Sequence, residues 1–98
     1  MQVNILVIGR HTEILEVILR LINGEPNWHA VGALADDKAI ALFNEQLFDI
    51  VLIGGGVNDE SIGTLTNRFK AKNPLIKIIK HYGGGSGLLF NEIQEALN

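Results

Sequence analysis

Residues 49–56, DIVLIGGG, place an acidic residue, four large apolar residues and three glycines in direct succession. The apolar run Ile50–Ile53 is typical of a central strand of a parallel sheet, which is buried on both faces. The three glycines that follow have no side chains and are expected to end the strand. In an open α/β sheet, ligands bind beyond the carboxyl ends of the strands. The stretch therefore predicts a central strand and marks the chain after it as a candidate site.

Three other segments have the pattern of strands. Val3–Ile8 is apolar on both faces and is predicted to be central. His29–Ala35 is rich in small residues and contains a glycine, which favours an edge or near-edge position. Leu75–Ile79 overlaps the sequence KIIK at 77–80, whose lysines are consistent with a protected edge strand.

Four helices are predicted between and after these strands, because apolar residues there recur at helical spacing. The inward face of the first is predicted to be Ile14, Val17, Ile18, Leu21 and Ile22. The inward faces of the other three are predicted to be Ile40, Phe43 and Leu47; then Ile62, Leu65 and Phe69; then Leu89, Ile93, Ala96 and Leu97. The predicted caps are Thr12, Asp36 or Asp37, Asn58 or Asp59, and Ser86.

The alternation of strands and helices calls for a parallel sheet with helices on both faces. We therefore expect one three-layer α/β/α domain over residues 1–98, with about four strands in the order 2-1-3-4.

Bulk composition excludes several classes of function. The chain is 47% hydrophobic and 19% charged, which is ordinary for a folded domain. A net charge of −3 argues against nucleic acid as the main partner. Without cysteine there is no thiolate zinc site or cysteine nucleophile, and the absence fits a cytoplasmic protein. No apolar run is long enough to span a membrane.

Three stretches at matching separations resemble the receiver domain of response regulators, which has the CheY-like variant of the flavodoxin-like fold. They are NILVIGRH at 4–11, AVGALADDKAIAL at 30–42 and FDIVLIGGG at 48–56. The resemblance extends more loosely to Tyr82. It implies a signalling module of this fold.

The functional positions of the family do not match. The family's acidic pair falls on Gly9 and Arg10, its phosphoacceptor aspartate on Gly54, and its hydroxyl residue near His81 or Tyr82. Phosphoryl transfer to a receiver needs a carboxylate nucleophile and further carboxylates that hold Mg²⁺. We therefore expect no aspartyl phosphate and no magnesium site.

One β-α unit of the receiver pattern is also expected to be missing before the last helix. The fourth strand then corresponds either to the receiver's fourth strand or to a fusion of its fourth and fifth. In the second case Lys80 stands in for the family's lysine, which follows the fifth strand.

In the order 2-1-3-4, the ends of the first, third and fourth strands lie side by side. The candidate pocket for a small anion consists of Arg10, His11, Gly54, Gly55, Gly56, Lys80 and His81. The loop before the last helix, Gly83, Gly84, Gly85 and Ser86, adds a helix N-terminus to it. The alternative is plain loop architecture, since glycines at strand ends also serve tight turns and neither cluster fits a phosphate-binding motif.

No catalytic or metal site is readable. His29 belongs at the opposite end of the sheet from His11 and His81, which are themselves separated by a strand. Ser61 is interpreted as a helix cap, and Trp28 is expected to close the bottom of the core.

The sequence thus favours a non-phosphorylatable receiver-like interaction module, which is not an enzyme and has no cofactor. We expect a protein partner or a homodimer on the side of the fourth strand. The alternative is a domain that binds a small anion or a nucleotide fragment through the glycine loops.

Overall fold

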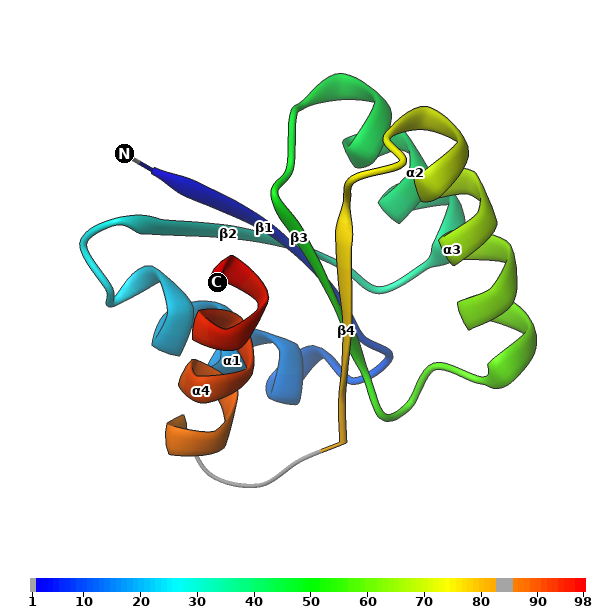
Figure 1. Ribbon diagram of the computed structural model, residues 1–98. Helices are drawn as coiled ribbons and strands as arrows, with labels where there is room; N and C mark the ends of the chain where they lie inside the picture. Colours follow the sequence, from blue (N-terminus) through cyan, green and yellow to red (C-terminus); the bar gives the residue numbers. More distant parts are fainter. Residues whose placement is uncertain (1, 83–85) are drawn as a thin grey trace.

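Four parallel strands form one sheet in the order β2-β1-β3-β4 (Figure 1). The strands are β1 (Val3–Ile8), β2 (Trp28–Ala33), β3 (Ile50–Gly54) and β4 (Lys77–His81). The computed structural model describes residues 2–82 and 86–98. The central positions of β1 and β3 and the edge positions of β2 and β4 confirm the strand order predicted from the sequence.

Two helices cover each face of the sheet (Figure 1). On one face lie α1 (Thr12–Asn23) and α4 (Ser86–Leu97), and on the other lie α2 (Asp36–Glu45) and α3 (Asp59–Lys72). The three-layer α/β/α arrangement of the flavodoxin-like, CheY-like fold is therefore confirmed.

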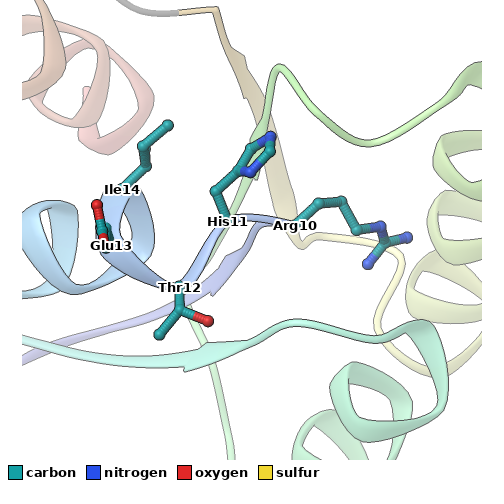
Figure 2. A pocket seen from close by; sticks show the side chains of 5 residues that line it. All are labelled: Arg10, His11, Thr12, Glu13 and Ile14. Carbon is teal, nitrogen blue, oxygen red and sulfur yellow. The ribbon is translucent and has the colours of Figure 1, made fainter.

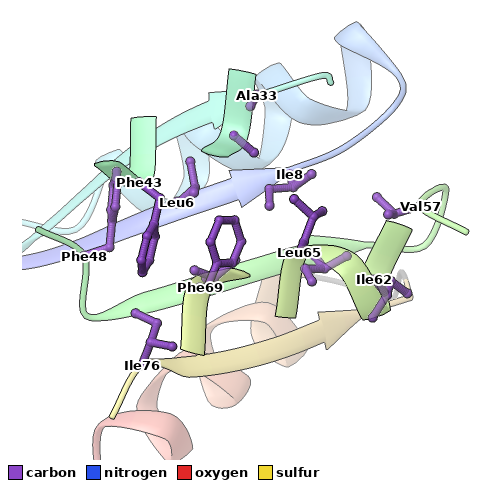
Figure 3. Close-up of a cluster of buried hydrophobic side chains, with 13 residues drawn as sticks. Leu6, Ile8, Ala33, Phe43, Phe48, Val57, Ile62, Leu65, Phe69 and Ile76 are labelled. Carbon is purple, nitrogen blue, oxygen red and sulfur yellow. The ribbon is translucent and has the colours of Figure 1, made fainter. Parts of the chain in front are cut away.

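The core has two layers because the sheet separates them. The layer under α2 and α3 contains the rings of Phe43, Phe48 and Phe69, and the centroids of Phe43 and Phe69 lie 4.4 Å apart (Figure 3). In the layer under α1 and α4, Trp28 is buried and meets the ring of Phe90 edge-on at 5.9 Å. Trp28 thus closes the core as predicted, although it is the first residue of β2 rather than part of the preceding loop.

The predicted inward face of α1 is wrong in part. Ile14 and Val17 are 58% and 46% exposed, whereas Leu15 and Ile22 are buried. The helix is rotated so that its leucines pack onto Gly32 of β2, where an added Cβ would lie 2.9 Å from Leu19 Cδ1. The missing side chain of the glycine therefore sets which face of α1 meets the sheet.

Two leucines at or beyond the ends of helices are also exposed, although the sequence predicted that they face inward. Leu47 is 87% exposed because it lies beyond the end of α2, and Leu97, the last residue of α4, is 39% exposed.

The helix starts agree with the sequence only in part. Asn58 caps α3 as predicted, with its Oδ1 accepting a hydrogen bond of 2.8 Å from the backbone N–H of Ser61. Ser61 is therefore in the first turn and is not the cap. The residue before α1 is His11 and the residue before α2 is Ala35, and neither makes a side-chain cap. Thr12, Asp36 and Asp37 thus begin their helices rather than cap them.

The boundaries of the outer strands also shift. The second strand ends at Ala33 rather than two residues later, and the fourth begins at Lys77 rather than Leu75. Leu75 belongs to a turn in which the backbone N–H of Ile76 donates to the carbonyl oxygen of Asn73. The predicted cap at Ser86 involves a side chain outside the described part of the structure.

Candidate functional site

The carboxyl ends of β1, β3 and β4 lie at one edge of the sheet, as the sequence predicted. In the register of β3 with β4, Gly54 is opposite His81. A Cβ added to Gly56 would lie 3.4 Å from the Cβ of Arg10 and 3.7 Å from Cδ2 of His11. The glycine turn after β3 therefore lies against the loop that follows β1.

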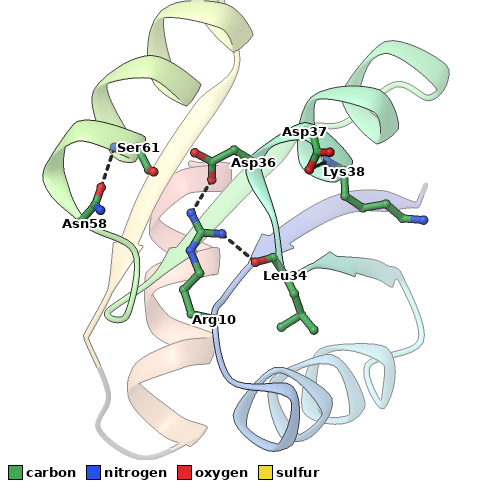
Figure 4. Close-up of polar contacts among 7 residues, drawn as sticks. All are labelled: Arg10, Leu34, Asp36, Asp37, Lys38, Asn58 and Ser61. Carbon is green, nitrogen blue, oxygen red and sulfur yellow. Dashed lines mark hydrogen bonds and ion pairs between the residues drawn. The ribbon is translucent and has the colours of Figure 1, made fainter.

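The side chain of Arg10 is bound to the loop between β2 and α2 and to the first residue of α2 (Figure 4). One terminal nitrogen donates to the carbonyl oxygen of Leu34 at 2.8 Å, and the other forms an ion pair with Oδ1 of Asp36. The planar guanidinium suits such a two-point contact. Arg10 thus ties two loops together at the position where the receiver pattern has an acidic residue.

The carboxylate of Asp36 is stabilised in its charged form by this contact. Burial alone would raise the pKa of Asp36, but the hydrogen bonds from Arg10 and Ser61 and the charge of Arg10 together lower it below its ordinary value. The described Arg10–Asp36 pair therefore neutralises much of the cationic charge that the sequence assigned to the pocket.

The side chain of His81 lies on the face of the sheet that α1 and α4 cover, away from the Arg10–Asp36 pair. Its side chain is buried, and its Nδ1 lies 2.5 Å from Oε1 of Glu92 on α4. A carboxylate only accepts hydrogen bonds, so Nδ1 donates. His81 and Arg10 therefore engage partners in two different layers of the protein.

The other predicted pocket residues are placed as follows. Lys80 is exposed on β4, and His11 is exposed at the start of α1. An open hollow of about 420 Å³ is lined by Arg10, His11, Thr12, Glu13 and Ile14, as Figure 2 shows. The candidate residues Gly83, Gly84 and Gly85 lie outside the described residues.

At Gly54, the position of the family's phosphoacceptor, an added Cβ would lie 3.2 Å from the carbonyl oxygen of Ile8. This is tight for a side chain. No group of three or more histidine, aspartate or glutamate residues able to hold a metal ion occurs among residues 2–82 and 86–98. His29 is opposite Asn4 at the amino end of the sheet, as predicted.

Sequence reasoning placed Asp36 near this edge without pairing it with Arg10, and it missed Glu92 as the partner of His81. A signal for the second exists, because Glu92 lies between the inward residues Leu89 and Ile93 of α4. An acidic residue at the margin of an apolar helix face predicts a partner on the packed element.

Neither the sequence models of known protein families nor the sequences of curated proteins match this chain. Within the described residues, no helix is both long and apolar enough to cross a membrane.

Solved structures do match it. A DrrB receiver domain activated with BeF3 aligns with a TM-score of 0.80 at 13% identity, over 99% of this chain and 98% of the other. The chemotaxis protein CheY4 of Vibrio cholerae gives 0.74 at 10% identity, over 98% and 99%. A response regulator receiver domain protein from Clostridium thermocellum gives 0.73 at 23% identity, over 95% of this chain and 73% of the other. The fold of this chain is therefore the fold of receiver domains.

Proposed function

We propose that the protein is a receiver-like signalling module that is not phosphorylated and acts by binding other proteins. The observation that carries this proposal is Gly54, which ends β3 at the position of the receiver phosphoacceptor. Glycine has no nucleophile. The proposal implies that the protein is not an enzyme.

The loop after β1 supports the same proposal. Receivers place their acidic pair there, and those carboxylates bind the magnesium ion that phosphoryl transfer requires. This chain has Gly9 and Arg10 instead, and the guanidinium of Arg10 is held by Asp36. A fixed positive charge beside the site would repel a dication. We therefore propose a site whose pair of charges ties two loops together.

Incubation with a small phosphodonor and Mg²⁺ is expected to leave the mass of the protein unchanged. A receiver domain that has the aspartate serves as the positive control under the same conditions. Intact-mass and peptide mass spectrometry provide the measurement. A gain of one phosphoryl group on any aspartate of this chain would refute the proposal.

The alternative, binding of a small anion or nucleotide fragment, is disfavoured by the contacts of Arg10, whose two terminal nitrogens already have partners. We expect phosphate, adenosine nucleotides and flavin mononucleotide to leave the melting temperature unchanged. A ligand that binds only the folded state would raise it. A rise that disappears in Arg10→Ala would instead support the alternative.

The partner is proposed to be another protein or a second copy of this chain, on the side of β4. β4 pairs only with β3 among the described strands, so it is an open edge. An open edge favours association. A regulatory role in the cytoplasm, a missing β-α unit and the correspondence of β4 to one or two receiver strands also remain predictions.

A further inference from the structure

The charges of the chain are distributed unevenly along its length. Between Ser61 and Asn91 there is no acidic residue, so all 11 aspartates and glutamates lie elsewhere. The five basic residues of this stretch are Arg68, Lys70, Lys72, Lys77 and Lys80. In a chain of net charge −3, the stretch that contains β4 is therefore strongly basic.

The basic residues nearest the open edge are on β4 and beside its start. Lys77 and Lys80 are exposed on the strand. Lys70 of α3 lies near the residue before the strand, because its Nζ is 3.4 Å from the carbonyl oxygen of Ile76. Lys72 is directed elsewhere, since its Nζ contacts the carbonyl oxygens of Phe43 and Asn44 at the end of α2.

Two acidic residues that contact β4, Glu92 and Asp49, have side chains that already have partners. Glu92 is bound to His81, and the carboxylate of Asp49 accepts a hydrogen bond from the backbone N–H of Asn4. No ion pair involves Lys77 or Lys80 among the residues that the structure describes. The edge therefore presents positive charge that the described chain does not balance.

The backbone of β4 has a defined set of outward groups. The N–H of Lys77 points toward β3, because it donates to the carbonyl oxygen of Asp49 at 3.5 Å. The N–H and C=O of one residue point to the same side of a strand, and the side alternates along it. Ile79 and His81 therefore also face β3, whereas the backbone groups of Ile78 and Lys80 face outward.

The sheet is incompletely covered on this side. Every residue of the β3 run Ile50–Ile53 is fully buried, but Ile78 and Ile79 of β4 are only half-buried. In Figure 1, β4 (yellow) forms the outer edge of the sheet. A further strand would pair the outward backbone groups and cover more of both isoleucines.

We propose that an acidic, extended segment of a partner protein adds to β4 as a fifth strand. Its backbone would bond to Ile78 and Lys80, and its carboxylates would lie near Lys77, Lys80 and Lys70. Strand addition takes its affinity from main-chain bonds and its specificity from side chains on the two faces. Two copies meeting through β4 would instead bring two basic stretches together, which like-charge repulsion disfavours.

This inference rests on the proposed protein-binding role, but its test is independent of phosphorylation. The probe is a short blocked peptide of paired glutamates and paired valines (Glu-Glu-Val-Val repeated), added to the full chain, because Lys77 and Lys80 lie on opposite faces of β4 and paired glutamates present a carboxylate to each face. Amide hydrogen exchange is followed by NMR. With peptide, we expect the amides of Ile78 and Lys80 to exchange more slowly by a factor of about ten or greater. The exchange rates of the Lys77, Ile79 and His81 amides are expected to change little.

Two variants and two probes control the experiment. Lys77→Glu combined with Lys80→Glu is expected to weaken binding roughly tenfold or more. Ile78→Pro removes an outward donor while leaving the bonds to β3, and it is expected to abolish binding with the circular dichroism spectrum retained. A lysine–valine peptide and a peptide N-methylated at alternate residues along its binding edge should not bind.

Several results would overturn the proposal. One is the absence of protection at Ile78 and Lys80 with peptide in excess. Another is equal affinity for an oligothymidylate or for the N-methylated peptide, which would indicate a general polyanion surface. A third is a dimer in light scattering that Ile78→Pro dissociates, because a second copy would then occupy the edge. A phosphorylated aspartate would refute the proposed function alone and leave these readouts intact.

Discussion

Phe69→Ala is expected to lower the free energy of unfolding by about 3–5 kcal/mol. The side chain is only 1% exposed, and its ring stacks on Phe43 in the layer under α2 and α3 (Figure 3). Truncation removes buried apolar surface and leaves a cavity between the helices and the sheet. Domains of this size are stable by about 5–15 kcal/mol in total, so the loss is a large share. Urea unfolding followed by circular dichroism measures it.

The matched control is Leu47→Ala, which also truncates a large apolar side chain. Leu47 is 87% exposed, so the change is expected to fall within about 0.5 kcal/mol of the wild type. Similar losses for the two variants would show that Phe69 does not hold the helices on the sheet as described.

Glu92→Ala is expected to destabilise the protein by about 1–3 kcal/mol. The change removes the acceptor for Nδ1 of His81, a residue that is 6% exposed and would be left with an unpaired buried donor. Glu92 also links α4 to β4, so exchange of the α4 amides should accelerate. Thermal melting and hydrogen exchange provide the two measurements.

Two comparisons isolate the His81 contact. Glu95→Ala changes an exposed glutamate on the same helix and is expected to have little effect. Glu92→Gln keeps an oxygen acceptor and is expected to retain most of the stability. Equal losses for Glu92→Ala and Glu95→Ala would indicate a general effect of charge on α4 instead.

The fold was predictable because its strongest signals are local. Continuous apolar runs such as Val3–Ile8 identify strands buried on both faces, and the alternation with helices then restricts the topology to a few choices. The rotation of α1 was not predictable in the same way. Seven of its residues are apolar and are spread around much of the helix, so periodicity alone could not decide whether Ile14 or Leu15 faces the sheet. Leu15 faces the sheet because α1 packs closely on Gly32, a residue that is distant in sequence.

The candidate site was predictable in place but not in its contacts. Arg10 and the glycines after β3 lie at the same edge of the sheet because the carboxyl ends of parallel strands share one edge. The partners of Arg10 and His81 depend on side-chain directions that sequence spacing does not specify. Arg10 is long enough to reach the β2–α2 loop, and His81 faces α4 because side chains alternate along β4.

The separation of the core into two layers has a consequence for how the chain folds during synthesis. The layer under α2 and α3 draws on residues from Leu6 to Ile78, so all its side chains are available before α4 leaves the ribosome. The other layer needs Leu89 and Ile93, which belong to α4. Until α4 emerges, a nascent sheet would have one face covered by two helices and the other covered by α1 alone. That interval is when the chain is most exposed to aggregation and to chaperones that bind apolar surface.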